Sequence, residues 1–464
     1  MTNGDERRYR SYFACYSKGL PHLSDGEVEA QAYAGLLRGL EQQDFDTLER
    51  IALGGRAKLV NPLGCAVLQN ESKHPGDFFV SPPPAFASRE QAAELVELYW
   101  AALCRDVPFA AYDADPLCVA AATELGQFDA FRGIKPSALF RGPSAGDAVG
   151  PYISQFLVLD VPYGPTRLKQ QYAAPTPGQE YMVDYDAWLA IQTGQLSRVS
   201  TYYSEEPRYL STGRRLAEFV RQDFSYQVFL NAALILLSFG PDALAPGNPY
   251  RRSRKQQGFV SQGVPDVLCA VAKAATYALN ATWHQKWAVH RRIRPEELAA
   301  RVHLHLRGRA AYPIDESLTR AEALARIHAE HASYLLPQAY PEGCPLHPAY
   351  PAGHAAVAGA CASVLKAFFD ESFVIPHPKV VSDDARALLA YGGDLIAGDE
   401  LNKLASNVAL GRNIAGIHWR SDVLAGLLLG EEVAIALLRE STDNYPEESA
   451  GQFFTRFSGE AVLL

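Results

Sequence analysis

The feature that most constrains the fold is a series of long segments, from about residue 206 onward, in which apolar residues recur at helical spacing. Gly, Pro or Ser stands at most boundaries of these segments, as is typical of helix ends. Strand-type alternation is scarce. We therefore predict a mainly α fold of helical bundles, with long loops and few short strands. The predicted helices span residues 214–239, 264–292, 318–335, 354–369, 383–410 and 422–440.

The first two hundred residues differ from this pattern. Helical pieces alternate there with loops such as SPPPAF, GPSAGDAVGPY and APTPGQEY. One clear helix follows Ser88, where Ser-Arg-Glu-Gln forms a capping box before an apolar-periodic run. We predict a supporting region over residues 1–205 and a helical-bundle region with the functional site over residues 206–464, within one compact unit.

The overall charge excludes some classes of partner. The 464 residues carry a formal net charge of −9, which argues against a general affinity for nucleic acid or anionic membrane. The N-terminus is charged where a signal peptide would be apolar. The longest apolar stretch, 228–239, is shorter than the ~20 residues that span a bilayer. We expect a cytoplasmic protein without nucleic-acid or membrane partners, in which any anion site is local.

The seven cysteines are odd in number and show no CxxC spacing. This pattern fits neither a complete disulfide framework nor a zinc cluster. We expect reduced, mostly buried thiols.

Three separated segments gather cations and histidines at helix ends. The first, 282–295, contains Lys286 and Arg294, which are eight residues apart. On an α-helix they would differ by about 80° in direction, so two long side chains can reach one point. Pro295 favours a helix end there. A solvated helix face explains such a pair equally well.

The second segment, 347–356, is a Pro/Gly turn that opens into a helix of small residues. The amide of Gly353 and the positive end of the helix dipole would favour an oxyanion there. An ordinary helix start, with His354 as a cap or core residue, is the alternative.

The third segment, 410–422, contains Arg412 and His418. Six residues apart on a continuous helix, they would point about 240° from one another. Gly411 and Gly416 offer a break that would aim both at one site, and Ser421 is placed to cap the next helix. A structural loop with a surface arginine is the alternative.

Together the segments supply three cations, an amide donor and two histidines. Arginine forks match the oxygens of a tetrahedral oxyanion, and the cations neutralise its charge. The combination therefore favours a site for phosphate or vanadate.

The order Lys-x7-Arg-Pro, Tyr-Pro-Ala-Gly-His and Gly-Arg-x5-His-x3-Asp resembles the vanadium-dependent haloperoxidases, particularly their algal bromoperoxidase branch. This family shares a superfamily with type 2 acid phosphatases. The likeness extends over nearly the whole chain, through GPYISQF at 150–156, YDAWLAIQ at 185–192, GNPY at 247–250 and LASNVALGRNIAGIHWRSD at 404–422.

The resemblance implies a vanadate cofactor, V(V), bound to the protein through His418. His354 would be the acid and base, and Lys286 would also act in catalysis by adding positive charge beside the reacting oxygens. Four residues would hold the vanadate oxygens: Lys286, Arg294, Gly353 and Arg412.

The same resemblance implies roles for four further residues. Asp223 would orient Arg294, although an acid at a helix N-terminus explains it equally well. Asp422 would steady the loop of His418. His347 stands where bromoperoxidases carry a second catalytic histidine, which disfavours chloride, and Trp283 either walls the halide pocket or packs in the core.

Ala352 departs from the family pattern, which usually has serine in this turn, with its hydroxyl bonded to a vanadate oxygen. Losing a hydrogen bond to a charged group costs about 1.5 to 3 kcal/mol. We expect weaker vanadate binding or a weaker oxidant, with a preference for the more easily oxidised iodide.

The implied reaction is oxidation of bromide or iodide by hydrogen peroxide to a hypohalous acid equivalent, with a small organic acceptor and a homo-oligomeric assembly. The first alternative is an acid phosphatase of the phosphatidic-acid phosphatase type, with His418 as nucleophile and His354 as general acid. Those enzymes more often show Lys-x6-Arg-Pro and a serine in the turn. The second alternative is an inactive oxyanion-binding protein.

Overall fold

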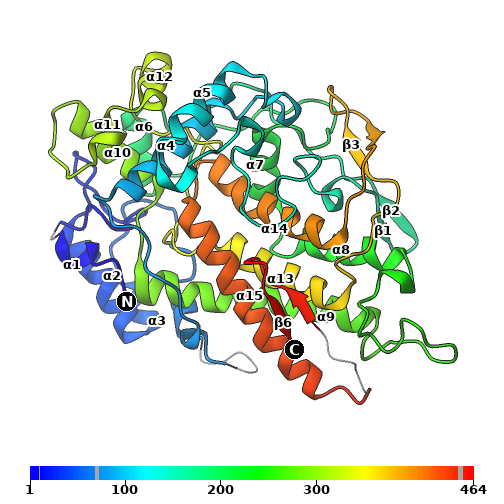
Figure 1. The fold of residues 1–464 in the computed structure, drawn as a ribbon. Helices are drawn as coiled ribbons and strands as arrows, with labels where there is room; N and C mark the ends of the chain where they lie inside the picture. The colour runs from blue at the N-terminus through cyan, green and yellow to red at the C-terminus, as the bar shows by residue number, and fades with distance from the viewer. Residues whose placement is uncertain (10, 68–72, 448–452) are drawn as a thin grey trace.

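The computed structural model describes residues 1–9, 11–67, 73–447 and 453–464. Within them the chain is mainly helical, as predicted (Figure 1). The helices are α1 (Asp5–Arg8), α2 (Ala30–Gln42), α3 (Phe45–Glu49), α4 (Arg89–Leu103), α5 (Pro116–Leu125), α6 (Tyr185–Gln192), α7 (Gly213–Gln222), α8 (Gln227–Ser238), α9 (Val264–Trp283), α10 (Pro295–Leu306), α11 (Glu316–Thr319), α12 (Glu322–His331), α13 (Gly353–Phe368), α14 (Ala397–Ile414) and α15 (Arg420–Asp443).

Short elements join these helices. Three antiparallel hairpins pair β1 (Val161–Tyr163) with β2 (Thr166–Leu168), β3 (Lys379–Val381) with β4 (Leu388–Ala390), and β5 (Phe453–Thr455) with β6 (Ala461–Leu463). The 3-10 turns are η1 (Pro62–Ala66), η2 (Pro75–Asp77), η3 (Phe109–Ala111), η4 (Asp129–Phe131), η5 (Pro136–Ala138), η6 (Gln155–Leu157) and η7 (Pro241–Ala243), and η8 (His284–His290) is a π-helix.

Helix α13 is the centre of the bundle and packs against α9, α14 and α15. Its small side chains allow very close approach. A Cβ added at Gly430 of α15 would lie 1.9 Å from the carbonyl oxygen of Ala356, and one at Gly426 would lie 2.7 Å from that of Ala352. The backbones of α13 and α15 are therefore in direct contact, which holds the N-terminal ends of both helices together.

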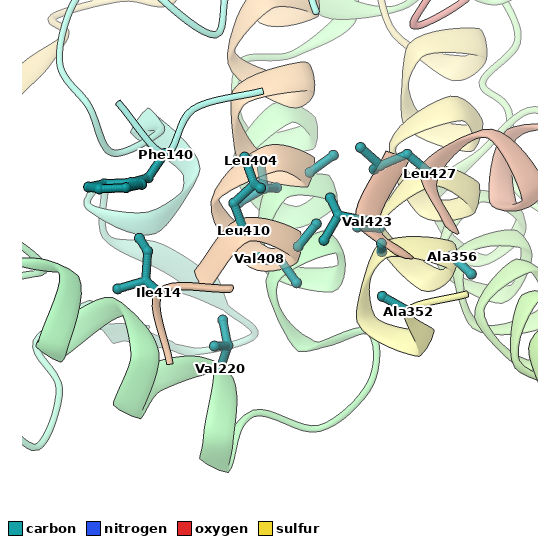
Figure 2. Packing of buried hydrophobic residues seen from close by; sticks show 14 of the residues in the cluster. Phe140, Val220, Ala352, Ala356, Leu404, Val408, Leu410, Ile414, Val423 and Leu427 are labelled. Carbon is teal, nitrogen blue, oxygen red and sulfur yellow. The ribbon is translucent and has the colours of Figure 1, made fainter. Parts of the chain in front are cut away.

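A large apolar core surrounds this contact. Figure 2 shows part of it, with Ala352 and Ala356 of α13, Val423 and Leu427 of α15, and Val408 of α14. Members of the same core occur as early as residue 14 and as late as residue 462. The predicted division near residue 205 stays a prediction.

Some predicted helices agree with the structure and others do not. Segments 354–369 and 422–440 correspond to α13 and α15. Segment 264–292 begins as predicted but becomes π-helical after α9, and segment 318–335 contains α11 and the shorter α12.

Two predicted helices were wrong: one is interrupted, and the other begins later than expected. Segment 214–239 is two helices, because Asp223 is extended, with φ −63° and ψ 146°. The Asp223 side chain lies 3.0 Å from His354 Nε2 of α13, so a long-range contact accompanies the break. Segment 383–410 becomes helical only at Ala397, since the β3–β4 hairpin and two glycines precede it.

The cysteines and the lengths of the apolar helices bear on two further expectations from the sequence. All seven cysteines are unpaired and all except Cys269 are buried, as predicted. In the parts of the chain that the structure describes, no helix combines the length and the apolar character needed to cross a bilayer.

Candidate active site

A cavity of about 240 Å³ lies at the N-terminal end of α13. It brings together side chains from segments that are far apart in the sequence, including Arg221 of α7 and Ser225 of the break that follows it. Its lining residues are Arg221, Ser225, Leu279, Trp283, Pro345, His347, Gly353, His354, Val357, Arg412 and His418. The structure thus gathers six of the residues singled out from the sequence.

Lys286 and Arg294 are buried beside this cavity. Arg294 Nη1 lies 3.1 Å from His418 Nε2, and Arg294 Nη2 lies 3.0 Å from His347 Nδ1. Lys286 Nζ donates to the carbonyl oxygens of Pro348 and Ala349 at 2.7 and 2.8 Å. Both cations therefore face the turn that precedes α13.

The two cations do not converge along one α-helix, so that part of the prediction was wrong. Lys286 lies in the π-helix η8, and the chain then reverses at Arg291, which has φ 42°. Arg294 is the N-cap of α10, whose first residue is Pro295. Glu297 accepts from the backbone N of Arg294 at 2.9 Å and fixes this entry into α10.

The segment between α14 and α15 aims His418 at the cavity. Gly411 lies inside α14, so the expected break there is absent, and the turn is made by Gly416 with φ 84°. His418 Nδ1 lies 2.9 Å from Asp422 Oδ2, which also accepts from Trp419 N. Asp422 rather than Ser421 thus caps α15, because a carboxylate at this position reaches both groups.

Asp223 contacts His354 and not Arg294, which corrects the expected pairing. Asp223 Oδ1 lies 3.0 Å from His354 Nε2, and the Asp223 side chain is only 3% exposed. The break after α7 turns this carboxylate toward the start of α13. Arg294 instead donates to the carbonyl oxygens of His347 and Ile417.

Within the described residues, no carboxylate forms an ion pair with the three buried cations of the site. Lys286, Arg294 and Arg412 are all buried, and their recorded partners are carbonyl oxygens, imidazoles and the Tyr340 hydroxyl. Arg412 Nε has no partner at all. Because an unpaired buried cation is costly, this arrangement suits a bound anion.

The electrostatics of the site favour the neutral imidazoles of His418 and His347. Burial lowers the pKa of His418 well below its ordinary value, and Arg294 and Lys286 lower it further. Burial also lowers the pKa of His347, with Lys286 next in effect. Burial likewise lowers the pKa of Lys286, an effect that an anion beside it would oppose. A neutral imidazole is the form that ligates metals.

The N-terminus of α13 supplies amide donors. Gly353 is its first residue, and the first amides of a helix have no partner within it. Ala352 is the N-cap, and its methyl group makes no capping hydrogen bond. A Cβ at Gly353 would lie 3.4 Å from the Trp283 ring, so glycine keeps the space between this amide and the indole open.

Sequence reasoning missed several residues of the site. Arg221, Ser225, Leu279 and Val357 line the cavity. Tyr340 lies under Arg412, with the guanidinium carbon 5.4 Å from the ring centroid. Arg221 stacks on the same ring at 5.2 Å. Short motifs give no signal for such residues, because their role depends on long-range packing.

Comparisons with known proteins agree with this picture. Residues 266–445 match the family model described as the VCPO second helical-bundle domain. The vanadium-dependent bromoperoxidase of Ascophyllum nodosum is 35% identical over 97% of this chain and 86% of its own length. That of Corallina officinalis is 31% identical over 100% and 94%.

A solved structure shows the same fold. The homohexameric second vanadate-dependent bromoperoxidase of Ascophyllum nodosum superposes with a TM-score of 0.95 at 30% identity, covering 100% of this chain and 86% of that one. Fold and sequence agree over the whole length of the chain. The chain therefore belongs to the vanadium-dependent haloperoxidase family.

Proposed function

We propose that this protein uses hydrogen peroxide to oxidise bromide or iodide to a hypohalous acid equivalent, with vanadate as cofactor. The observation that carries the proposal is the set of three buried cations, without carboxylate partners among the described residues, around His418. The bromoperoxidase names of the relatives support the same activity.

The residues present fit vanadate. His418 Nδ1 is bonded to Asp422, so Nε2 is left with the lone pair that would bind vanadium. The oxygens of vanadate would be held by Lys286, Arg294, Arg412 and the amide of Gly353. When bound, vanadate supplies a Lewis-acid centre that activates hydrogen peroxide toward a halide.

The remaining chemistry belongs to side chains of this chain. His354 accepts the proton of hydrogen peroxide, and Asp223 stabilises the imidazolium that forms. With Nε2 bonded to Asp223, Nδ1 is the ring nitrogen that exchanges protons. Lys286 stabilises negative charge that develops on the reacting oxygens, and it does so strongly because it is fully buried.

One wall of the cavity is suited to the halide and to a small organic acceptor. The rings of Trp283 and His347 lie 4.9 Å apart, and Leu279 and Val357 extend an apolar surface beside them. A polarisable, weakly hydrated halide loses less on entering such a site than chloride does. We infer bromide and iodide as substrates in preference to chloride.

The assembly is proposed to be a homo-oligomer. The support is the relative of the same fold, whose solved structure is homohexameric. Light scattering of the purified protein measures the mass directly, and a monomer would contradict this part of the proposal.

The decisive experiment adds vanadate to metal-free protein and measures peroxide-dependent halogenation of a dye with iodide, bromide and chloride, together with phosphatase activity. We expect halogenation with iodide and bromide only. His418→Ala should abolish it, whereas His377→Ala, in an exposed remote position, should not. Phosphatase turnover without halogenation, or vanadate binding without either activity, would reject the proposal.

A further inference from the structure

One buried arginine joins α4, in the N-terminal part of the chain, to the start of α15. Arg292 Nη1 donates to Asp422 Oδ1 and to Ser421 Oγ, both at 2.7 Å. Its Nη2 donates to Gln91 Oε1 and Glu94 Oε2, both at 2.8 Å. The Arg292 side chain is 2% exposed, so these bonds are made away from water. A single guanidinium therefore connects two helices that are more than 300 residues apart in the sequence.

The other end of this connection is the imidazole of His418. Asp422 divides its two oxygens: Oδ1 accepts from Arg292, and Oδ2 faces His418 Nδ1 at 2.9 Å. Because both oxygens are engaged, the carboxylate has no freedom to rotate. Asp422 is fully buried, so no water replaces either partner.

This arrangement decides which nitrogen of His418 carries the proton. A carboxylate held against Nδ1 accepts a hydrogen bond from it, which leaves the lone pair on Nε2. His418 lines the cavity, and Arg294 Nη1 lies nearer to its Nε2, at 3.1 Å, than to its Nδ1, at 3.4 Å. If Asp422 could turn away, the tautomer with hydrogen on Nε2 would become populated, and that tautomer cannot ligate through Nε2.

We propose that Arg292 is a positioning residue for the metal ligand: by holding Asp422 against Nδ1 it keeps His418 in the tautomer and orientation that bind vanadium. The inference rests on the proposed function and adds α4, through Glu94 and Gln91, to the vanadate-binding apparatus. Glu94 also accepts from Ser421 N at 2.6 Å, which fixes the first turn of α15.

The chain contains a matched control for this role. Glu97, on α4, pairs with Arg420 at the start of α15, and both side chains are largely buried. This second ion pair joins the same two helices but does not touch Asp422. Removing its charge therefore disturbs the packing between the helices without releasing the carboxylate behind His418.

The experiment compares Arg292→Gln, Arg292→Lys, Glu94→Gln and Glu97→Gln as full-length, metal-free proteins. Vanadate affinity is measured by equilibrium dialysis, the His418 tautomer by ¹⁵N NMR of the imidazole nitrogens, and stability by thermal unfolding. Loss of a partner behind a metal ligand typically lowers affinity about 10- to 100-fold. We expect such a loss in Arg292→Gln together with a signal for hydrogen on Nε2, and a smaller loss in Arg292→Lys.

The control separates positioning from stability. Glu97→Gln should lower the melting temperature comparably while leaving vanadate affinity within about threefold and the tautomer unchanged. If Arg292→Gln does not fold, Arg292→Lys and Glu94→Gln still report the same shift in the tautomer. The inference would be overturned if the Arg292 and Glu94 variants kept the vanadate affinity and the His418 tautomer of the unmodified protein. If the unmodified protein itself failed to bind vanadate, the proposed function would be overturned instead.

Discussion

Ala352 occupies the turn position where the resemblance to the vanadium-dependent haloperoxidases implies a serine. The serine usual in that turn offers a hydroxyl, whereas Ala352 presents a fully buried methyl group at the N-cap of α13. The position lies directly before the Gly353 amide, at the end of the cavity where the cations gather. We therefore predict that the missing donor weakens the hold on a bound oxyanion.

Restoring the hydroxyl should strengthen the site. For Ala352→Ser we expect a gain of about 1.5 to 3 kcal/mol in vanadate binding, because a hydrogen bond to a charged group contributes that much. The ratio of bromide to iodide turnover should rise as well. Equilibrium dialysis and parallel turnover assays measure both quantities. Ala362→Ser, buried farther along α13, is the control, and equal behaviour of both variants would contradict a role for residue 352.

Asp223 offers a test of proton transfer apart from binding. In Asp223→Asn the His354 imidazolium loses its carboxylate partner, so kcat for bromide should fall about tenfold or more, since acid-base catalysis contributes about 10²- to 10⁴-fold. Vanadate affinity should change little, because Asp223 does not contact His418 or the three cations. Steady-state kinetics and dialysis give the two values. A large loss of affinity with normal kcat would assign Asp223 to binding.

At the scale of elements, the π-helix η8 places Lys286. A π-helical turn accommodates an extra residue relative to an α-helix and shifts the direction of the side chains that follow. Sequence reasoning identified Lys286 and Arg294 from their spacing but assumed a regular helix between them. Hydrophobic periodicity does not reveal a π-turn, because the same apolar residues satisfy both helices.

Deleting the exposed Ala288 should convert η8 toward α-helix and rotate the chain that leads to Arg294. We expect vanadate affinity to fall at least tenfold with helical content unchanged, as measured by dialysis and circular dichroism. Ala288→Ser keeps the register and should bind as the wild type does. Normal binding by the deletion variant would show that the π-turn is not needed to place the cations.

Short sequence patterns predicted those helix starts that depend on neighbouring residues alone. The helix starts at Gly353 and near Asp422 were readable from a Pro/Gly turn and from small-residue periodicity. The break at Asp223 and the β3–β4 hairpin were not, because long-range contacts decide them. The same holds for the pairing of Asp223 with His354, which requires knowing where the end of α7 lies relative to the start of α13.

At the scale of the whole molecule, the N-terminal part packs against the segment that carries His418. The loop-rich pattern of residues 1–205 predicts a supporting region. In the structure, Gln91 and Glu94 of α4 are buried and bond to Arg292, which holds Asp422. Glu97 packs the same helix against α15 through Arg420, away from Asp422. No motif predicts this, because each acid looks like an ordinary helical surface residue until its partners are known.

A buried carboxylate makes global stability depend on pH. Burial raises the pKa of Asp147 from 3.8 to about 6, although Ser144 N and Ser406 Oγ donate to it. Its contribution to stability is therefore complete below pH 3.8 and is lost as pH rises through about 6. The difference corresponds to about 3 kcal/mol.

Asp147→Asn should remove this dependence. The free energy of unfolding of the wild type, relative to the variant, should fall by about 2.4 kcal/mol between pH 4 and pH 7. Urea unfolding at both pH values measures the difference, and Asp383→Asn, at an exposed position, serves as the control. A constant difference between wild type and Asp147→Asn would show that Asp147 titrates alike in the folded and unfolded chain.

The glycine contacts between α13 and α15 have a consequence for how rigid the site is. Gly353 begins α13, and His418 lies two residues before α15, whose main chain touches that of α13 at Gly426 and Gly430. Rotamer changes in the surrounding core do not enter this backbone contact. We therefore expect the main-chain spacing between residues 353 and 418 to change little with temperature while the bundle remains folded.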